Sequence, residues 1–136
     1  MNHITVAYQG QLRQHITYPD SPQTVFTDGP AIAGGLPGNP SPVELLAGSF
    51  AACALTIMAL RAESLGADFS GCTAEVADKE VSMKEFRIKK LALKFNLKQA
   101  FNAEVRQAVE SAVTDMCIVG RSLHPDLVQT FEFNYQ

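Results

Sequence analysis

Basic residues are scarce in this chain, and tryptophan is absent. The 136 residues hold 11 Lys and Arg against 14 Asp and Glu, which gives a formal net charge of −3. Arg13 is the only Lys or Arg before Arg61. A surface that binds nucleic acid or an anionic membrane needs a basic patch, so the composition argues against both kinds of partner. We therefore expect no nucleic acid and no membrane among its partners.

Cysteine is also scarce, with three residues in the chain. Three cysteines do not make the disulfide framework of a small secreted protein, and an odd count fits a reducing compartment. The N-terminus has no basic segment followed by an apolar core, as a signal peptide would. The apolar run from Leu45 to Leu60 is too short to span a bilayer comfortably. These features predict a soluble cytoplasmic protein, with residues 1–136 forming a single domain.

Recognised motifs for metals and nucleotides are missing as well. The Cys and His residues lack the local spacing of metal ligands. The glycines of Gly34–Gly38 are interrupted and are not followed by the Lys-Ser or Lys-Thr pair of a phosphate-binding loop. We therefore expect no metal and no cofactor.

Periodicity and turn residues predict an α+β domain with the order βββ-α-ββ-α-β. The expected strands lie within 4–18 on either side of Gly10, at 24–27, at 71–78, at 86–98 and at 128–135. A long loop rich in Gly and Pro covers 29–42, helices cover about 42–65 and 103–117, and a short helical turn lies at 121–125. One chain then offers one curved sheet and two helices.

The first helix has clear ends and an unusual middle. Ser41 can cap it, Pro42 suits its first position, Glu44 completes a capping box and Gly66 ends it. Its middle is apolar on every face, so it must be surrounded by other structure. One sheet cannot enclose such a helix, and we therefore expect a dimer in which the two central helices are sandwiched.

Two cysteines are the candidates for chemistry, and the residues alone leave two interpretations open. Cys53 lies mid-helix among alanines, where apolar burial suppresses the thiolate, so a reactive Cys53 needs a cation from elsewhere. Cys117 is expected at the C-terminus of the second helix, where the dipole disfavours a thiolate. That placement suits a thiol that answers an oxidised partner. Alternatively, both residues are ordinary core packing, which is common for free cysteine.

The segment Ser41-Pro-Val-Glu-Leu-Leu-Ala, with Cys53 on the same helix, and the segment Cys117-Ile-Val-Gly-Arg-Ser-Leu-His-Pro125 resemble the OsmC/Ohr family. This family comprises osmotically inducible and organic hydroperoxide resistance proteins, and the resemblance covers nearly the whole chain. It implies an intertwined homodimer in which two sheets enclose the central helices. It also implies a site at the subunit interface and a cysteine-based peroxidase that acts in oxidative-stress defence.

The resemblance also assigns roles to residues. Cys53 matches the peroxidatic cysteine, whose thiolate attacks an organic hydroperoxide and becomes a sulfenic acid. Cys117 matches the resolving cysteine, which forms a disulfide that an external dithiol reductant then reduces. Arg13 matches the arginine that stabilises the thiolate and polarises the peroxide.

The chain departs from the family at one position. The family's better-known peroxidases hold the arginine with a glutamate ten positions before the peroxidatic cysteine, and this chain has Val43 there. Glu44 is one residue on and is expected in the capping box. His124 either assists Cys117 or bonds a loop backbone, and Cys72 has no expected role. The missing glutamate motivates the alternative function, a non-enzymatic protein that binds a small apolar ligand at the dimer interface.

Overall fold

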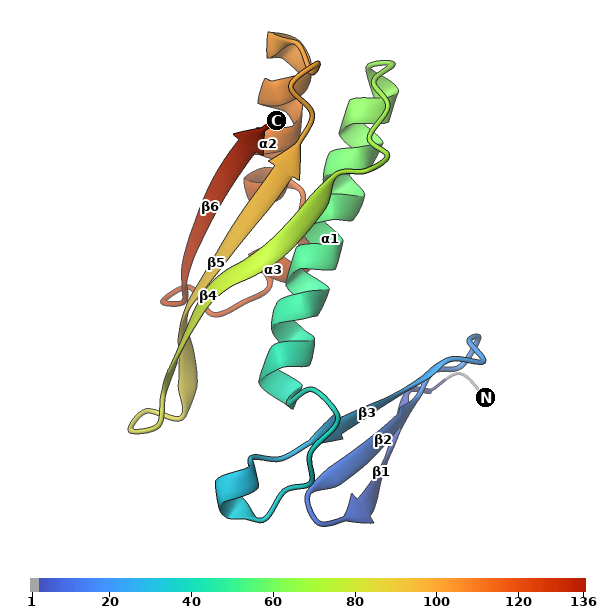
Figure 1. Ribbon diagram of the computed structural model, residues 1–136, viewed down its shortest axis with the longest axis vertical. Coiled ribbons are helices and arrows are strands. Elements are labelled where there is room, and N and C mark those ends of the chain that lie inside the picture. The colour runs from blue at the N-terminus through green and yellow to red at the C-terminus, as the bar shows by residue number, and fades with distance from the viewer. Residues whose placement is uncertain (1–2) are drawn as a thin grey trace. The chain divides into compact units, whose positions relative to one another are not determined.

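The computed structural model describes residues 3–136 (Figure 1). The chain divides into two compact units, Met1–Leu46 and Ala47–Gln136. Each unit holds one three-stranded sheet. The expected single curved sheet is therefore wrong, because the first three strands pair among themselves and so do the last three. A single domain over 1–136 stays a prediction.

The N-terminal unit is built on a three-stranded antiparallel sheet. Its strands are β1 (Thr5–Gly10), β2 (Arg13–Thr17) and β3 (Thr24–Asp28), and β2 lies in the middle. The register between β2 and β3 places Arg13 directly opposite Asp28. The buried residues of these strands are polar, namely Thr27 and Asp28.

The Gly- and Pro-rich segment after β3 folds back on the sheet. It contains a short 3-10 helix, η1 (Ala31–Ala33), which the sequence pattern did not indicate. The backbone N–H of Asp28 donates to Pro40 O at 3.0 Å, and that of Gly29 donates to Leu12 O at 2.9 Å. A Cβ at Gly35 would lie 2.0 Å from Gly29 O, so only glycine allows this close approach. The loop is thus tied to the strand ends.

Helix α1 (Pro42–Ser64) begins and ends close to where the sequence predicts. Ser41 N donates to Glu44 Oε1 at 3.0 Å, and Glu44 N donates to Ser41 Oγ at 3.1 Å, which is the expected capping box. At the other end, Gly66 has a φ of 81° and Ala67 N donates to Ala62 O. A left-handed glycine of this kind is a common helix stop.

The C-terminal sheet consists of β4 (Thr73–Ser82), β5 (Arg87–Leu97) and β6 (Val128–Tyr135). β4 is antiparallel to β5, and β6 is parallel to β5. β4 runs to Ser82, beyond the predicted end at 78. Alternate side chains of β5 are buried on one face of the sheet, namely Leu91, Leu93, Phe95 and Leu97.

Helix α2 (Ala103–Asp115) is capped by Asn102, whose side chain accepts from Val105 N at 2.9 Å. The predicted end at 117 is wrong, because the chain leaves the helix at Met116, which has a φ of −129° and is 44% exposed. A short helix, α3, then covers Ile118–Arg121 rather than the predicted 121–125.

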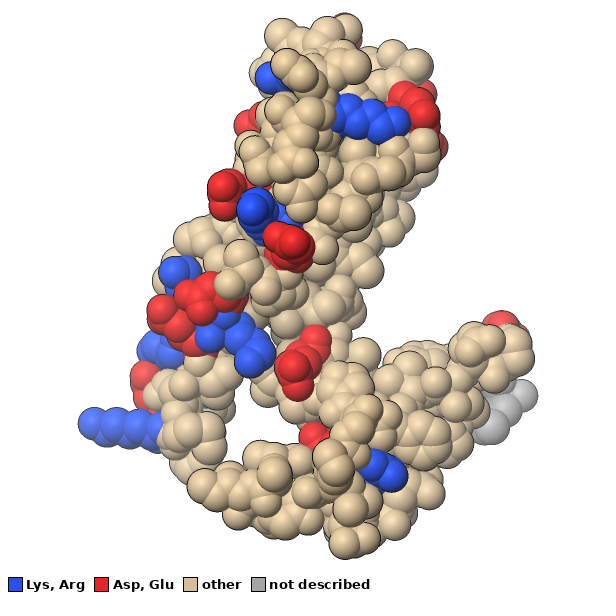
Figure 2. Space-filling view, in the orientation of Figure 1, with Lys and Arg blue, Asp and Glu red and all other residues tan. Residues whose placement is uncertain are grey.

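In the C-terminal unit, α1 packs against the apolar face of the sheet. Phe50 is fully buried and meets the Phe131 ring edge-on at 6.2 Å. By length and composition alone, α1 is apolar enough to cross a membrane, with a mean hydropathy of 1.9, a test that core helices also pass. The expected enclosure on every face is not seen within one chain, since Ala52, Thr56 and Leu60 are exposed. Figure 2 shows charged side chains gathered over β4 and β5 and few along the visible length of α1.

Candidate functional site

The fold of the C-terminal unit brings Cys53 and Cys117 together, although 63 residues separate them in the sequence. Cys53 lies half-buried in the middle of α1, and Cys117 is fully buried between α2 and α3. Both are free thiols. The Cys53 side chain acts on the Cys117 thiol as a hydrogen-bond partner and through its charge. The two side chains are therefore neighbours in the C-terminal unit.

Close packing between α1 and α3 allows this meeting. Gly120 of α3 lies against Phe50, which is one helical turn before Cys53 on α1. A Cβ at Gly120 would lie 2.5 Å from Phe50 Cε1, well inside van der Waals contact. The absence of a side chain at position 120 is what lets the two helices approach.

The surroundings of Cys117 keep its proton in place. Burial raises the pKa of the Cys117 thiol, and the Cys53 sulfur raises this pKa further by hydrogen bonding and charge. The backbone N–H groups of Gly120 and Val119 act in the opposite direction. The expected position at a helix C-terminus is only half right, because Cys117 is also the residue that precedes α3. Its proton is retained mainly through burial.

Arg13 belongs to the N-terminal unit, where it forms an ion pair with the carboxylate of Asp28. Its Nε donates to Asp28 Oδ1 at 2.7 Å and its Nη2 to Asp28 Oδ2 at 3.0 Å, a two-pronged ion pair. Nη2 also donates to Pro37 O at 3.1 Å. Asn39 donates to Asp28 Oδ2 through both its backbone N–H and its side-chain amide, each at 3.1 Å. The guanidinium therefore has a fixed orientation within this unit.

Charge and hydrogen bonding stabilise both partners in their ionised forms. The hydrogen bonds from Arg13 hold the pKa of Asp28 below its usual range, although burial opposes the shift. Hydrogen bonding to Asp28 in turn raises the pKa of Arg13. The Asp28 carboxylate is nearly inaccessible, with 3% of its side chain exposed, whereas 29% of the Arg13 side chain is exposed. The accessible partner of the pair is therefore the cation.

Asp28 was not predicted from the sequence, although a signal for it was present. The turn at 19–22 lies between β2 and β3, and its midpoint is equidistant from residues 13 and 28. Antiparallel pairing about that midpoint places Arg13 opposite Asp28, as observed. A carboxylate that pairs with the lone N-terminal cation could thus have been predicted.

Three further residues named from the sequence, Glu44, His124 and Cys72, lie in a helix cap, in a loop and before a strand. Glu44 forms the capping box with Ser41, as expected. His124 Nδ1 accepts from Asp126 N at 3.0 Å, which agrees with the loop-bonding interpretation. Cys72 precedes β4, and burial raises the pKa of its thiol. None of the described His, Cys, Asp and Glu residues form a group of three or more that could hold a metal ion.

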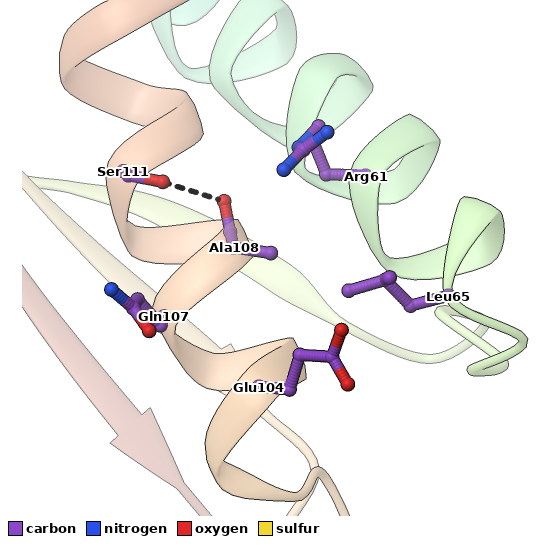
Figure 3. Close-up of a pocket in the computed structure, with 6 residues that line it drawn as sticks. All are labelled: Arg61, Leu65, Glu104, Gln107, Ala108 and Ser111. Carbon is purple, nitrogen blue, oxygen red and sulfur yellow. Dashed lines mark hydrogen bonds between the residues drawn. The ribbon is translucent and has the colours of Figure 1, made fainter.

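A separate pocket of about 220 Å³ lies between the end of α1 and the exposed side of α2 (Figure 3). Its lining residues are mainly polar: Arg61, Leu65, Glu104, Gln107, Ala108 and Ser111. Ser111 Oγ donates to Ala108 O at 3.2 Å across its wall. This pocket carries charged groups and lies within one chain, so it is a different site from the apolar dimer-interface cavity of the alternative function, which stays a prediction.

Comparison with known proteins decides the family. The sequence model described as OsmC-like protein matches residues 34–131, a segment that includes both Cys53 and Cys117. The chain belongs to the OsmC family. No curated protein matches the OsmC chain closely enough to supply a function.

Solved structures share this fold over nearly their whole length. A Psychrobacter arcticus protein, described as an osmotic stress induced and detoxification response protein, is 30% identical, with a TM-score of 0.90 and coverage of 98% of this chain and 96% of that one. The organic hydroperoxide resistance protein OhrB of Bacillus subtilis is 20% identical, with a TM-score of 0.67 and coverage of 96% and 97%. An OsmC like protein from Mycoplasma pneumoniae is 14% identical, with a TM-score of 0.78 and coverage of 100% and 96%.

Proposed function

We propose that this OsmC protein is a thiol peroxidase that reduces organic hydroperoxides in oxidative-stress defence. The observation that carries the proposal is that two free thiols, Cys53 on α1 and Cys117 just before α3, are neighbours. Two core cysteines that pack only as small hydrophobes have no need to meet. Structural neighbours that are named organic hydroperoxide resistance proteins give the proposal its substrate class.

The first step oxidises Cys53. Its thiolate attacks the terminal oxygen of the hydroperoxide, the O–O bond breaks, and an S–O bond forms. The departing alkoxide takes up one proton and leaves as an alcohol, while Cys53 becomes a sulfenic acid. Cys53 suits this role because it is accessible in part, whereas Cys117 is fully buried and holds its proton.

The second step joins the two cysteines. The Cys117 sulfur attacks the sulfenic sulfur of Cys53, an S–S bond forms, and the hydroxyl group leaves as water with the Cys117 proton. An external dithiol then reduces the disulfide by exchange and is itself oxidised. The influence of the Cys53 side chain on the Cys117 thiol supports this step, since it makes the two residues neighbours.

Arg13 supplies the positive charge that the chemistry requires. An apolar helix disfavours a thiolate, so Cys53 needs a cation, and Arg13 is the only one in the first sixty residues. We assign it to the stabilisation of the Cys53 thiolate and the polarisation of the peroxide. The cation is accessible while its partner Asp28 is not, which supports this role.

The proposed active form is a cytoplasmic homodimer. Within one chain, α1 leaves apolar residues exposed, including Leu60 at 58%. The N-terminal unit also exposes Ile4, Val6 and Tyr8. A second copy that covers these surfaces would enclose α1, as the pattern of its sequence requires.

The decisive experiment counts thiols after oxidation. Purified reduced protein is treated with cumene hydroperoxide, and its free thiols are titrated. We expect two of the three thiols to disappear in wild type and none in Cys53→Ser. In Cys117→Ser, Cys53 should form a sulfenic acid that dimedone traps. Cys72→Ser is the matched control and should lose the same two thiols as wild type.

The opposite outcome is equally clear. If Cys53 stays reduced at a large excess of cumene hydroperoxide, the protein is not a peroxidase of this kind. A small ligand that co-purifies and is identified by mass spectrometry would then favour the non-enzymatic binding function.

A further inference from the structure

We propose that Asp28 is the positioning residue for Arg13. It plays the role of the helix glutamate that this chain lacks. This inference rests on the proposed peroxidase function, because it assigns Arg13 a task at Cys53. It goes beyond that function by naming the residue that orients the cation, on a strand rather than on α1.

Asp28 fixes the orientation of the Arg13 guanidinium. Asp28 is bonded to two different guanidinium nitrogens of Arg13, Nε and Nη2, at 2.7 and 3.0 Å. Such a fork fixes both the direction and the rotation of the planar group, which a single hydrogen bond does not. Pro37 O accepts a further bond from Nη2. Among the described residues, no acceptor is bonded to Nη1, so one edge of the guanidinium stays available for an anion.

Asp28 is itself held in place by the loop that follows β3. Its Oδ2 accepts two bonds from Asn39, and its backbone N–H donates to Pro40 O. A positioning group works only if its own rotamer is locked, and here the neighbouring loop locks it. The carboxylate is also shielded from water, with 3% of its side chain exposed. Such shielding makes its ionic hydrogen bonds stronger than those of an open surface pair.

Two residues at the start of α1 are the nearest rivals of Asp28. Val43, at the position where the glutamate is expected, has no charge. Glu44, one residue later, uses its carboxylate in the capping box with Ser41. Arg13 Nε forms its ion pair with Asp28 Oδ1 at 2.7 Å.

The test compares Asp28→Asn with Asp28→Glu, using Asp20→Asn as the control. Asp28→Asn keeps the shape of the side chain and removes the ionic fork, and Asp28→Glu retains a carboxylate. Asp20 is an exposed turn residue of the same unit, so its substitution makes the same change of charge without touching Arg13. We expect Asp28→Asn to slow the oxidation of Cys53 by cumene hydroperoxide about 100-fold, as a misplaced group typically does. Asp28→Glu should recover part of the rate, and Asp20→Asn should match wild type.

A second readout separates positioning from simple charge. The rate of Cys53 alkylation by iodoacetamide is followed against pH by mass spectrometry in a Cys72→Ser background. If Asp28 acted only as a counter-charge, its removal would leave the positive charge of Arg13 uncompensated. The midpoint of Cys53 alkylation would then fall to lower pH. Loss of positioning predicts the reverse, a midpoint that rises. An unchanged or lower midpoint in Asp28→Asn would overturn the inference.

A third readout keeps the test valid if the loop loosens. The Nε–H resonance of Arg13 in a nitrogen-15 NMR spectrum should be sharp and protected from exchange in wild type and in Asp28→Glu, and should broaden in Asp28→Asn. Failure of the proposed function looks different. In that case wild-type Cys53 does not react with hydroperoxide at all, while the alkylation and NMR results still judge the role of Asp28.

Discussion

The two sheets of this chain have equal numbers of strands, but one buries apolar side chains and the other buries polar ones. The C-terminal sheet buries Leu91, Leu93 and Phe95 almost completely. The N-terminal sheet buries Thr27 and Asp28 and exposes Val6 at 57% and Tyr8 at 63%. The hydrophobic effect therefore accounts for the stability of the C-terminal sheet. It leaves the N-terminal sheet without an apolar core of its own.

The contrast suggests a division of labour. The C-terminal unit has a buried apolar core and carries the two neighbouring thiols, Cys53 and Cys117. The N-terminal unit is organised by an ion pair and backbone hydrogen bonds, and its apolar face needs cover from elsewhere. A cation on such a unit can be positioned accurately only through polar contacts, and the Arg13–Asp28 fork is a contact of that kind.

The largest effect is expected from Phe95→Ala in the buried sheet. Phe95 is fully buried and lies 5.4 Å from the Phe133 ring and 6.4 Å from the Phe131 ring. Removal of a buried phenyl ring lowers the free energy of unfolding by about 3–5 kcal/mol. Urea denaturation followed by circular dichroism measures the loss. A loss below about 1 kcal/mol would mean that this buried core is not what stabilises the C-terminal unit.

The apolar face of the N-terminal sheet can be tested with Val6→Asp. If a second copy covers this face, an unpaired charge there is costly, and the dimer dissociation constant should rise about tenfold to a hundredfold. Sedimentation at several concentrations measures the change. Gln9→Asp adds the same charge to β1 at a polar position and should have a small effect. A Val6→Asp protein that stays dimeric with unchanged stability would contradict the proposed cover.

The contact between α1 and α3 is tested by Gly120→Ala. The added methyl group would overlap the Phe50 ring, and overpacking of this kind costs about 1–3 kcal/mol of unfolding free energy. It should also separate the thiols and slow disulfide formation between Cys53 and Cys117. The double variant Gly120→Ala with Phe50→Leu removes the outer ring atoms and should recover part of the loss. Independent, additive effects would show that the two residues do not interact.

A smaller effect is expected at the start of α2. Asn102 accepts the Val105 N–H, and loss of such a cap costs about 1 kcal/mol. Asn102→Ala should lower the unfolding free energy by this amount in urea denaturation. Asn102→Asp keeps an acceptor at the same place and should stay close to wild type. Equal losses in both variants would mean that the cap bond contributes nothing.

The sequence predicted local structure well because the signals for it are local. The capping box at Ser41 and the helix stop at Gly66 both lie within a few residues of the helix ends that they determine. The end of α2 was missed because Met116 continues the apolar spacing and no Gly or Pro marks the stop. The meeting of Cys53 and Cys117 depends on packing between α1 and α3, which no local pattern encodes. Membership of the OsmC family, rather than residue spacing, made that meeting expected.

The smallest effect concerns Asp68, an exposed residue between α1 and β4. Hydrogen bonds from the Ser70 backbone N–H, then from its hydroxyl, and finally from Lys98, lower the pKa of Asp68 to about 2. This folded-state pKa lies below the unfolded value of about 3.9, so the contribution to stability is present above about pH 4 and is lost as the pH falls towards 2. Over that interval, the stability advantage of wild type over Asp68→Asn should shrink.

The two kinds of contact at Asp68 can be told apart by NMR titration of its carboxyl carbon. The Ser70 backbone bond is the leading cause, with N to Oδ1 at 3.0 Å, whereas Lys98 Nζ lies 3.2 Å from Oδ2. In Lys98→Ala the pKa of Asp68 should therefore stay below the usual 3.8, because both Ser70 donors persist. Titration at the usual value in this variant would mean that the Lys98 charge, rather than the turn, determines the ionisation of Asp68. An exposed carboxylate would then follow the same rule as Arg13 and Asp28, in which a partner distant in the sequence holds the charge.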